Sequence, residues 1–135
     1  MNVSNTSNIP PRIMVVDDER DILRIVKRDL EADDIAFKVD VFHSSELALQ
    51  ELDNHPKDYY DLILTDIRMP KMNGFELYTE IQKIDNQVKV CFITAGEMYY
   101  GVYTDIFNSL DAKYFIRKPI DNEELVKRVN NMISS

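Results

Sequence analysis

Residues 62–74 read LILTDIRMPKMNG and combine three local signals. The first four are apolar or β-branched, which is typical of a short strand buried on both faces, and Asp66 stands where that strand ends. Asn73, with Glu76 three residues on, predicts a capping box that begins a helix. Apolar residues then repeat at helical spacing, at Leu77, Ile81 and Ile84. The stretch therefore predicts a strand, an acidic residue at its carboxyl end, and a helix.

The same alternation of strand and helix runs through the rest of the chain. Short apolar or β-branched runs predict four more strands, at 12–16, 37–42, 90–94 and 114–117. Amphipathic stretches predict four more helices, over about 19–33, 44–54 and 103–110 and behind Asp121, an N-cap with Glu124 three residues on. The residues expected to face the core from these helices are Ile22, Ile25, Val26 and Leu30; Leu47, Ala48 and Leu52; Tyr103, Ile106, Phe107 and Leu110; and Val126, Val129 and Ile133.

Five repeats of strand then helix predict an α/β fold. The expected architecture is a doubly wound parallel sheet with right-handed crossovers and helices on both faces. The strand at 37–42 alternates apolar and polar residues, which suggests an edge strand with one wetter face. Lys127 and Arg128 are expected on the solvated face of the last helix.

The composition excludes several classes of protein. The chain has 135 residues, the length of one domain, and its 24 acidic and 16 basic residues give a net charge of −8, which argues against a reader of duplex DNA. The single cysteine, Cys91, cannot form an internal disulfide, and His43 and His55 stand apart and predict no zinc site. No apolar run approaches the roughly 18 residues of a membrane span, and residues 1–11 lack the apolar run of a signal peptide. We expect a flexible leader at 1–11, one domain at 12–135, and a soluble cytoplasmic protein with no nucleic-acid or membrane partner.

Polar side chains leave the predicted strands at their carboxyl ends, namely Asp17 and Asp18, Asp66, Thr94, and Lys118. Ligands of doubly wound sheets bind at this edge. Three carboxylates close together repel one another and need a cation, and oxygen ligands without His or Cys suit Mg²⁺. A lysine and a threonine hydroxyl suit phosphate oxygens, and an ionised aspartate can attack phosphorus without a general base. The pattern predicts phosphoryl transfer onto a carboxylate, although any one of these aspartates taken alone could be an ordinary loop or cap residue.

Four stretches resemble the receiver domain of response regulators: VVDDE at 15–19, DIRMPKMNG at 66–74, TA at 94–95, and KPI at 118–120. The similarity covers about Arg12 to Ile133, and the run from 66 to 74 is its most specific part. The resemblance implies a flavodoxin-like sheet of strand order 2-1-3-4-5. It also implies a signalling switch, which assists its own phosphorylation and dephosphorylation, and not an enzyme.

The resemblance further implies a phosphoacceptor and a metal site. Asp66 would accept the phosphoryl group. Asp18 would bind Mg²⁺ directly, Asp17 would support the ion directly or through water, and Asp66 would be a further ligand. Arg68 would offer its backbone carbonyl to the metal, so its side chain is not required. Arg68 and Gly96 also occupy positions that tune dephosphorylation in the family, which leaves the lifetime of the phosphorylated state open.

Three residues would form the switch that the resemblance implies. Thr94 and Lys118 would contact the phosphoryl group, with a cis peptide bond between Lys118 and Pro119. Phe115 stands at the family's aromatic switch position and, because it has no hydroxyl, would act through packing alone. Its repacking would change the surface formed by the helix near 103–110, the strand at 114–117 and the last helix. The tyrosines at 99, 100 and 103 fit either a core stripe or an exposed recognition patch.

We therefore expect a stand-alone receiver that takes its phosphoryl group from the phosphohistidine of a sensor kinase or a histidine phosphotransfer protein. Its output would be an unknown downstream protein, and it would be a monomer or a weak dimer. Two alternatives stay open, a protein-interaction module that phosphorylation does not control and a phosphorelay intermediate. An aspartate phosphohydrolase is disfavoured because residues 16–19 lack the Asp-x-Asp spacing, and a nucleotide-binding enzyme because no glycine follows the first strand.

Overall fold

Strands and helices alternate along the chain. The structure, a computed structural model, describes residues 9–32, 37–94, 114–119 and 121–134. In chain order the described elements are β1 (Arg12–Val16), α1 (Arg20–Leu30), β2 (Lys38–Phe42), α2 (Ser45–Asp53), β3 (Leu62–Asp66), α3 (Gly74–Ile84), β4 (Lys89–Thr94), β5 (Phe115–Arg117) and α5 (Asn122–Ser134). All five predicted strands are present. The helix predicted over 103–110 lies outside the described residues, and so do Gly96, Tyr99 and Tyr100.

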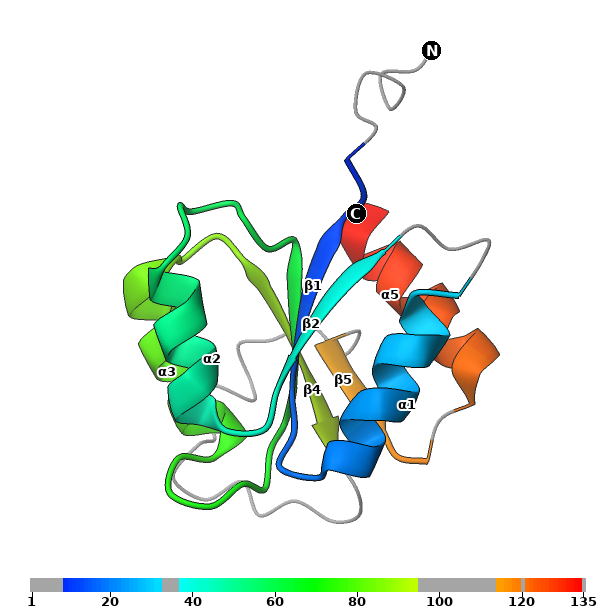
Figure 1. The fold of residues 1–135 in the computed structure, drawn as a ribbon, viewed down its shortest axis with the longest axis horizontal. Coiled ribbons are helices and arrows are strands. Elements are labelled where there is room, and N and C mark those ends of the chain that lie inside the picture. Colours follow the sequence, from blue (N-terminus) through cyan, green and yellow to red (C-terminus); the bar gives the residue numbers. More distant parts are fainter. Residues whose placement is uncertain (1–8, 33–36, 95–113, 120, 135) are drawn as a thin grey trace.

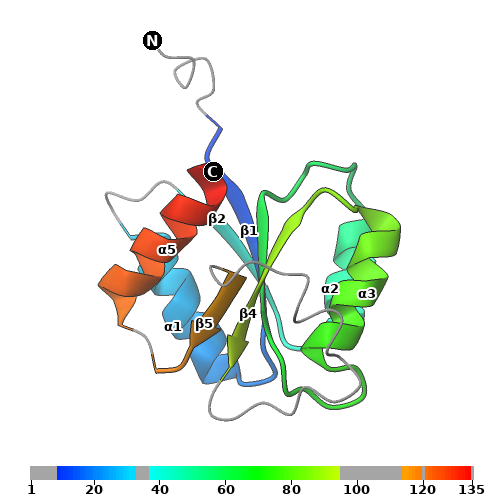
Figure 2. The same ribbon diagram turned by 180° about the vertical axis from the view of Figure 1, so that it is seen from behind.

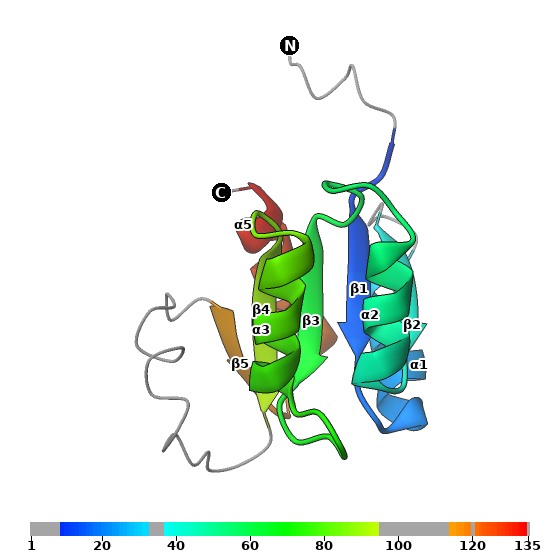
Figure 3. The ribbon, with the colours of Figure 1, turned by 90° about the vertical axis from the view of Figure 1, so that its left-hand side faces the viewer.

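The five strands form one parallel sheet in the order β2-β1-β3-β4-β5, as predicted. Residues 62–66 of the central strand β3 are all buried, which explains why the strand begins with three apolar residues. β2 lies at one edge of the sheet, as its alternating pattern predicted, and β5 lies at the other. Because all the strands run in the same direction, their carboxyl ends lie along one border of the sheet, at right angles to the edge strands (Figure 3). This border is the sheet edge at which the candidate site lies.

Helices cover both faces of the sheet. α1 and α5 lie on one face and α2 and α3 on the other (Figure 1, and from behind in Figure 2). Successive residues of β1 alternate between these layers, so that Ile13 and Val15 pack with α1 and α5 while Met14 and Val16 pack with α2 and α3. No helix in the described part of the chain is long and apolar enough to cross a membrane.

The structure corrects several predicted core positions on the helices. Ile25 of α1 and Leu47 of α2 are exposed, whereas the prediction placed both against the sheet. Leu23 takes the buried position on α1, and Leu125 and Met132 are buried on α5, where Val126 and Ile133 are only half-buried. Each helix has more apolar residues than one stripe can bury, and the angle at which the helix docks selects among them.

Two side chains at the end of α1, those of Lys27 and of the C-cap residue Glu31, cover part of the free edge of β2. The backbone amide of Lys38 points towards β1 and donates to the carbonyl of Pro11. Successive residues of a strand alternate in direction, so the backbone amide of Val39 points towards the free edge. Val39 donates its amide to Glu31 Oε2 at 2.8 Å and accepts at its carbonyl from Lys27 Nζ at 2.6 Å. An unpaired strand edge invites pairing with another chain, and these contacts satisfy the edge groups of Val39 within the molecule.

Candidate functional site

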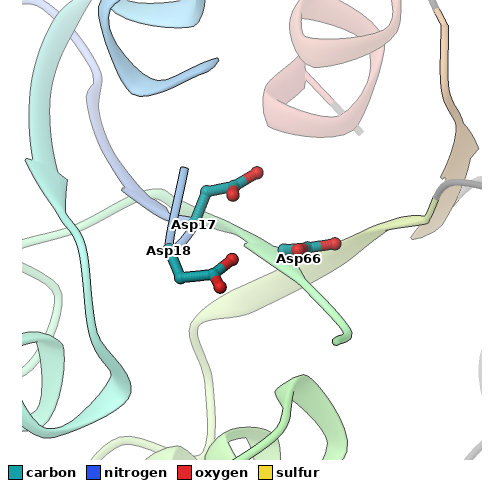
Figure 4. Close-up of side chains that lie close together, drawn as sticks. All are labelled: Asp17, Asp18 and Asp66. Carbon is teal, nitrogen blue, oxygen red and sulfur yellow. The ribbon is translucent and has the colours of Figure 1, made fainter. Parts of the chain in front are cut away.

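Three carboxylates lie together at the carboxyl ends of β1 and β3 (Figure 4). Asp17 and Asp18 follow β1, and Asp66 ends β3. Each offers a carboxylate oxygen, and these oxygens all lie within 4.8 Å of one another. Asp17 and Asp66 are buried, whereas Asp18 is exposed. The sheet therefore brings together the three acidic residues predicted to share a site.

Backbone amides hold the two buried carboxylates in place. Ile67 donates its amide to Asp66 Oδ1 at 2.9 Å, and Glu19 donates its amide to Asp17 Oδ1 at 2.9 Å. Glu19 is the N-cap of α1 but makes no capping hydrogen bond with its own side chain. Asp17 thus occupies one amide at the start of the helix, and each of these carboxylates keeps its second oxygen for another partner.

Lys118 reaches this cluster from β5, on the other side of β4. Its Nζ lies 3.1 Å from Asp17 Oδ2 and 3.7 Å from Asp66 Oδ1. Its backbone amide donates to the carbonyl of Thr94 at 2.7 Å, which fixes the end of β5 against the end of β4. The peptide bond between Lys118 and Pro119 is cis, as predicted. Thr94 itself is buried at the end of β4, so the structure places every residue of the predicted cluster at one edge of the sheet.

Burial and charge shift the ionisation of two of these groups. Burial raises the pKa of Asp66 to about 6, and the charge of Asp17 adds to the rise, while Lys118 and the Ile67 amide oppose it. Burial alone would lower the pKa of Lys118, but its hydrogen bond to Asp17 and the charges of Asp17 and Asp66 outweigh burial and raise it. At pH 7 Lys118 is therefore a cation, and Asp66 is still mainly an anion.

Gly74 is a site-forming residue that the sequence analysis missed. It is the first residue of α3, and its amide donates to the carbonyl of Ile67 at 2.8 Å. A Cβ at this position would lie 2.4 Å from the carbonyl oxygen of Asp66 and 2.9 Å from the Cα of Ile67. Only glycine lets α3 begin this close to the end of β3. The sequence contained a signal for this contact, because Gly74 is one of only three glycines, but the contact itself is tertiary.

The remaining predicted residues lie at different distances from the cluster. Arg68 is exposed in the loop after β3. Phe115 lies on β5, which β4 separates from the strand of Asp66, and it is half-buried, with its ring stacked on that of Phe92 at a centroid distance of 5.4 Å. The aromatic group continues to Phe75 of α3, whose ring centroid is 4.9 Å from that of Phe92. Phe115 therefore packs into the layer that includes α3.

The chemistry of the cluster fits a small divalent cation. All three candidate ligands are carboxylates, which are hard oxygen donors, and the cluster contains no imidazole or thiolate. Mg²⁺ suits this set, because it takes few protein ligands and keeps several waters, and the exposed position of Asp18 leaves one side of the cluster open to solvent. Lys118 balances only part of the negative charge.

Comparisons with known proteins agree with this geometry. A family model described as the response regulator receiver domain matches residues 13–130. Response regulator SaeR of Staphylococcus aureus (strain USA300) is 28% identical over 122 residues, which is 90% of this chain and 50% of SaeR, so the chain spans about half the length of the curated relatives it matches.

Solved structures of receiver domains superpose on this chain. A response regulator receiver domain protein from Clostridium thermocellum superposes with a TM-score of 0.78 at 29% identity, covering 92% of this chain and 94% of the other. A CheY-like receiver domain protein from Methanospirillum hungatei JF-1 superposes with a TM-score of 0.79 at 25% identity, covering 93% and 94%. With its doubly wound sheet and acidic cluster, the chain belongs to the response regulator receiver domain family, whose members are signalling switches of two-component systems.

Proposed function

We propose that Asp66 accepts a phosphoryl group from the phosphohistidine of a sensor kinase or of a histidine phosphotransfer protein. The observation that carries this proposal is the grouping of Asp66 with Lys118 Nζ, 3.7 Å away, and with two further carboxylates at the same sheet edge. A carboxylate flanked by an ammonium group and a candidate metal site is arranged to take up and hold a phosphoryl group.

The transfer itself requires a nucleophile and a leaving group. A carboxylate oxygen of Asp66 attacks phosphorus, a P–O bond forms, the P–N bond to the donor imidazole breaks, and the imidazole leaves with the electron pair of that bond. With a pKa of about 6, Asp66 is mainly ionised at pH 7 and needs no base. Oδ1 of Asp66 already accepts from the Ile67 amide, which favours Oδ2 as the attacking atom.

The other residues of the site would bind the phosphoryl oxygens or the metal. Lys118 would contact one phosphoryl oxygen as a point charge, and the Thr94 hydroxyl would donate to another. Asp17, Asp18 and Asp66 would hold Mg²⁺, together with the backbone carbonyl of Arg68. Bound there, Mg²⁺ supplies positive charge that offsets the negative charge of the carboxylates and of the phosphoryl oxygens.

Phosphorylation would change the surface near β5. The phosphoryl group adds close to two negative charges beside Asp17, and attraction to it would draw Thr94 and Lys118 inward. Phe115, stacked on Phe92, would then repack and alter the surface formed by β5 and α5, and a downstream protein would read that change. We place this switch in the cytoplasm, where kinases have access to ATP.

Mass spectrometry of the whole chain tests the proposal. Incubation with acetyl phosphate and Mg²⁺ should add one phosphate, and Asp66→Asn should abolish the addition. Asp53→Asn, which changes an exposed carboxylate at the end of α2, is the control and should label as the wild type does. Labelling of Asp66→Asn at the wild-type level, or no labelling of the wild type by acetyl phosphate or by a phosphorylated histidine kinase, contradicts the proposal. Hydrolysis of p-nitrophenyl phosphate by the wild type would instead indicate a phosphohydrolase.

A further inference from the structure

The strand that delivers Lys118 is the shortest of the described strands and lies at an edge of the sheet. β5 has three residues and pairs with β4 only, with Phe92 opposite Phe115 and Thr94 opposite Arg117. The amide of Lys118 points towards β4, since it donates to the Thr94 carbonyl. Alternate residues of a strand direct their backbone groups to opposite sides, so the carbonyl of Phe115 points towards the free edge.

Arg128 of α5 closes that edge. Its Nη2 donates to the carbonyl oxygen of Phe115 at 2.7 Å. The sequence analysis placed Arg128 on a solvated face, but it is half-buried, whereas its neighbour Lys127 is exposed as predicted. Leu125 and Val129 are buried against the sheet and fix the rotation of α5, which directs the arginine towards β5.

The backbone of β5 is therefore held on both sides just before the site. Arg128 holds Phe115 from α5, and Thr94 holds Lys118 from β4, three residues later. Between these two hydrogen bonds the chain has little freedom to slide or to tilt. The position of Lys118 Nζ, 3.1 Å from Asp17 and 3.7 Å from Asp66, depends on that backbone.

We propose that Arg128 is a positioning residue for phosphorylation. By holding the Phe115 carbonyl it fixes β5, and through β5 it places Lys118 at Asp66. This inference rests on the proposed function, which assigns Lys118 to the phosphoryl oxygens. Because coupling free energies are reciprocal, a partner that binds α5 and draws Arg128 away would disfavour phosphorylation, and phosphorylation would in turn strengthen the contact between Arg128 and Phe115.

The molecule contains a matched control for this contact. Lys89, at the start of β4, donates from Nζ to the carbonyl of Met132 in α5 at 2.6 Å. This is also a bond from a cationic side chain to a carbonyl, and it also joins α5 to the sheet. It lies at the amino end of β4, however, far along the strand from Thr94 and the carboxylates. A role in attaching α5 to the sheet is shared by both bonds, whereas a role in placing Lys118 belongs to Arg128 alone.

The experiment compares the full chain with Arg128→Met, Arg128→Lys and Lys89→Met. Two quantities are measured: the hydrogen exchange rate of the Lys118 amide by NMR in the unphosphorylated protein, and the initial rate of phosphorylation by acetyl phosphate with Mg²⁺. Loss of one hydrogen bond of this kind corresponds to about a fivefold change in an equilibrium or a rate. Arg128→Met should speed exchange at Lys118 and slow phosphorylation by about that factor, Arg128→Lys should recover most of both, and Lys89→Met should change neither.

Equal phosphorylation rates for the wild type and Arg128→Met overturn the proposal, and so does an equal loss in Arg128→Met and Lys89→Met, since that shows only a loss of stability. If Arg128→Met does not fold, Arg128→Gln replaces it with the same expected result. If the wild type is not phosphorylated at all, the proposed function fails, and the exchange rate at Lys118 then decides by itself whether Arg128 holds β5.

Discussion

Gly74→Ala puts the packing of α3 against the phosphoacceptor to a direct test. The added Cβ would stand 2.4 Å from the carbonyl oxygen of Asp66, whereas ordinary contacts begin at 3.4 Å, so the two segments must separate by about 1 Å. The three nearest atoms belong to the backbone of Asp66 and Ile67, so no side chain can rotate away. Separation would also weaken the hydrogen bond from the Gly74 amide to the Ile67 carbonyl.

These effects give an expected loss of stability. Overpacking costs about 1–3 kcal/mol, and the lost hydrogen bond costs about 1 kcal/mol, while alanine returns up to about 1 kcal/mol of helix propensity. The free energy of unfolding should fall by about 2 kcal/mol. With an unfolding entropy of about 2.1 cal/mol/K per residue, a chain of 135 residues should lose about 7 °C in Tm. Displacement of Asp66 should also slow phosphorylation at least about tenfold.

Urea unfolding followed by circular dichroism measures the change in free energy, and a thermal scan measures Tm. Thr79→Ala is the matched control, because it also places alanine in α3 but at an exposed position, and it should change stability by less than about 0.5 kcal/mol. A Gly74→Ala variant as stable as Thr79→Ala, with an unchanged phosphorylation rate, would refute the reasoning.

Three other substitutions test separate parts of the structure. Lys118→Met should leave the buried Asp17 carboxylate without its cation and lower the free energy of unfolding by about 2 kcal/mol in the absence of Mg²⁺. Because the lysine no longer competes for the carboxylates, Mg²⁺ binding measured by calorimetry should become tighter. Weaker Mg²⁺ binding would show that Lys118 does not compete with the metal for these carboxylates. Asn73→Ala should lower the free energy of unfolding by about 1 kcal/mol in urea by removing the capping box of α3, and no change would mean that the cap is dispensable. Burial alone would raise the pKa of Glu31, but the Val39 amide and Lys27 hold this pKa below its usual value of 4.5. The ionised carboxylate therefore stabilises the folded state above pH 4.5, and this stability is lost as the pH falls through the lower pKa of the folded state. Glu31→Gln should therefore be less stable than the wild type near pH 7 by about 0.5–1 kcal/mol, and the gap should close in acid; a gap independent of pH rules out this account.

Much of the fold follows from local patterns in the sequence. Residues 62–64 are apolar because both faces of the strand are covered, and the capping box at Asn73 and Glu76 begins α3 as predicted. Asp121 caps α5, with its carboxylate accepting from the Glu124 amide at 2.8 Å. The two caps depend on neighbours within a few residues, and the apolar run is a continuous stretch of sequence, so the sequence displays these features directly.

Exposure on the helices was harder to predict. Ile25 and Leu47 are apolar and each directly precedes a buried residue, Val26 and Ala48 respectively, yet both are exposed. Arg128 was expected in solvent and instead contacts β5. Hydrophobic spacing locates a stripe only to within about one residue, and the final rotation of a helix depends on the sheet against which it packs.

For the site, the sequence by itself determined which groups stand at the carboxyl ends of the strands. That was enough to predict an acidic cluster with a lysine and a threonine, because parallel strands bring their carboxyl ends to one edge. Only the tertiary structure decided that Asp17 is buried and its neighbour Asp18 exposed, and that Lys118 reaches Asp17 across 101 residues of chain. Burial and pairing depend on the register of the strands and the docking of the helices, which are set by contacts between segments far apart in the sequence.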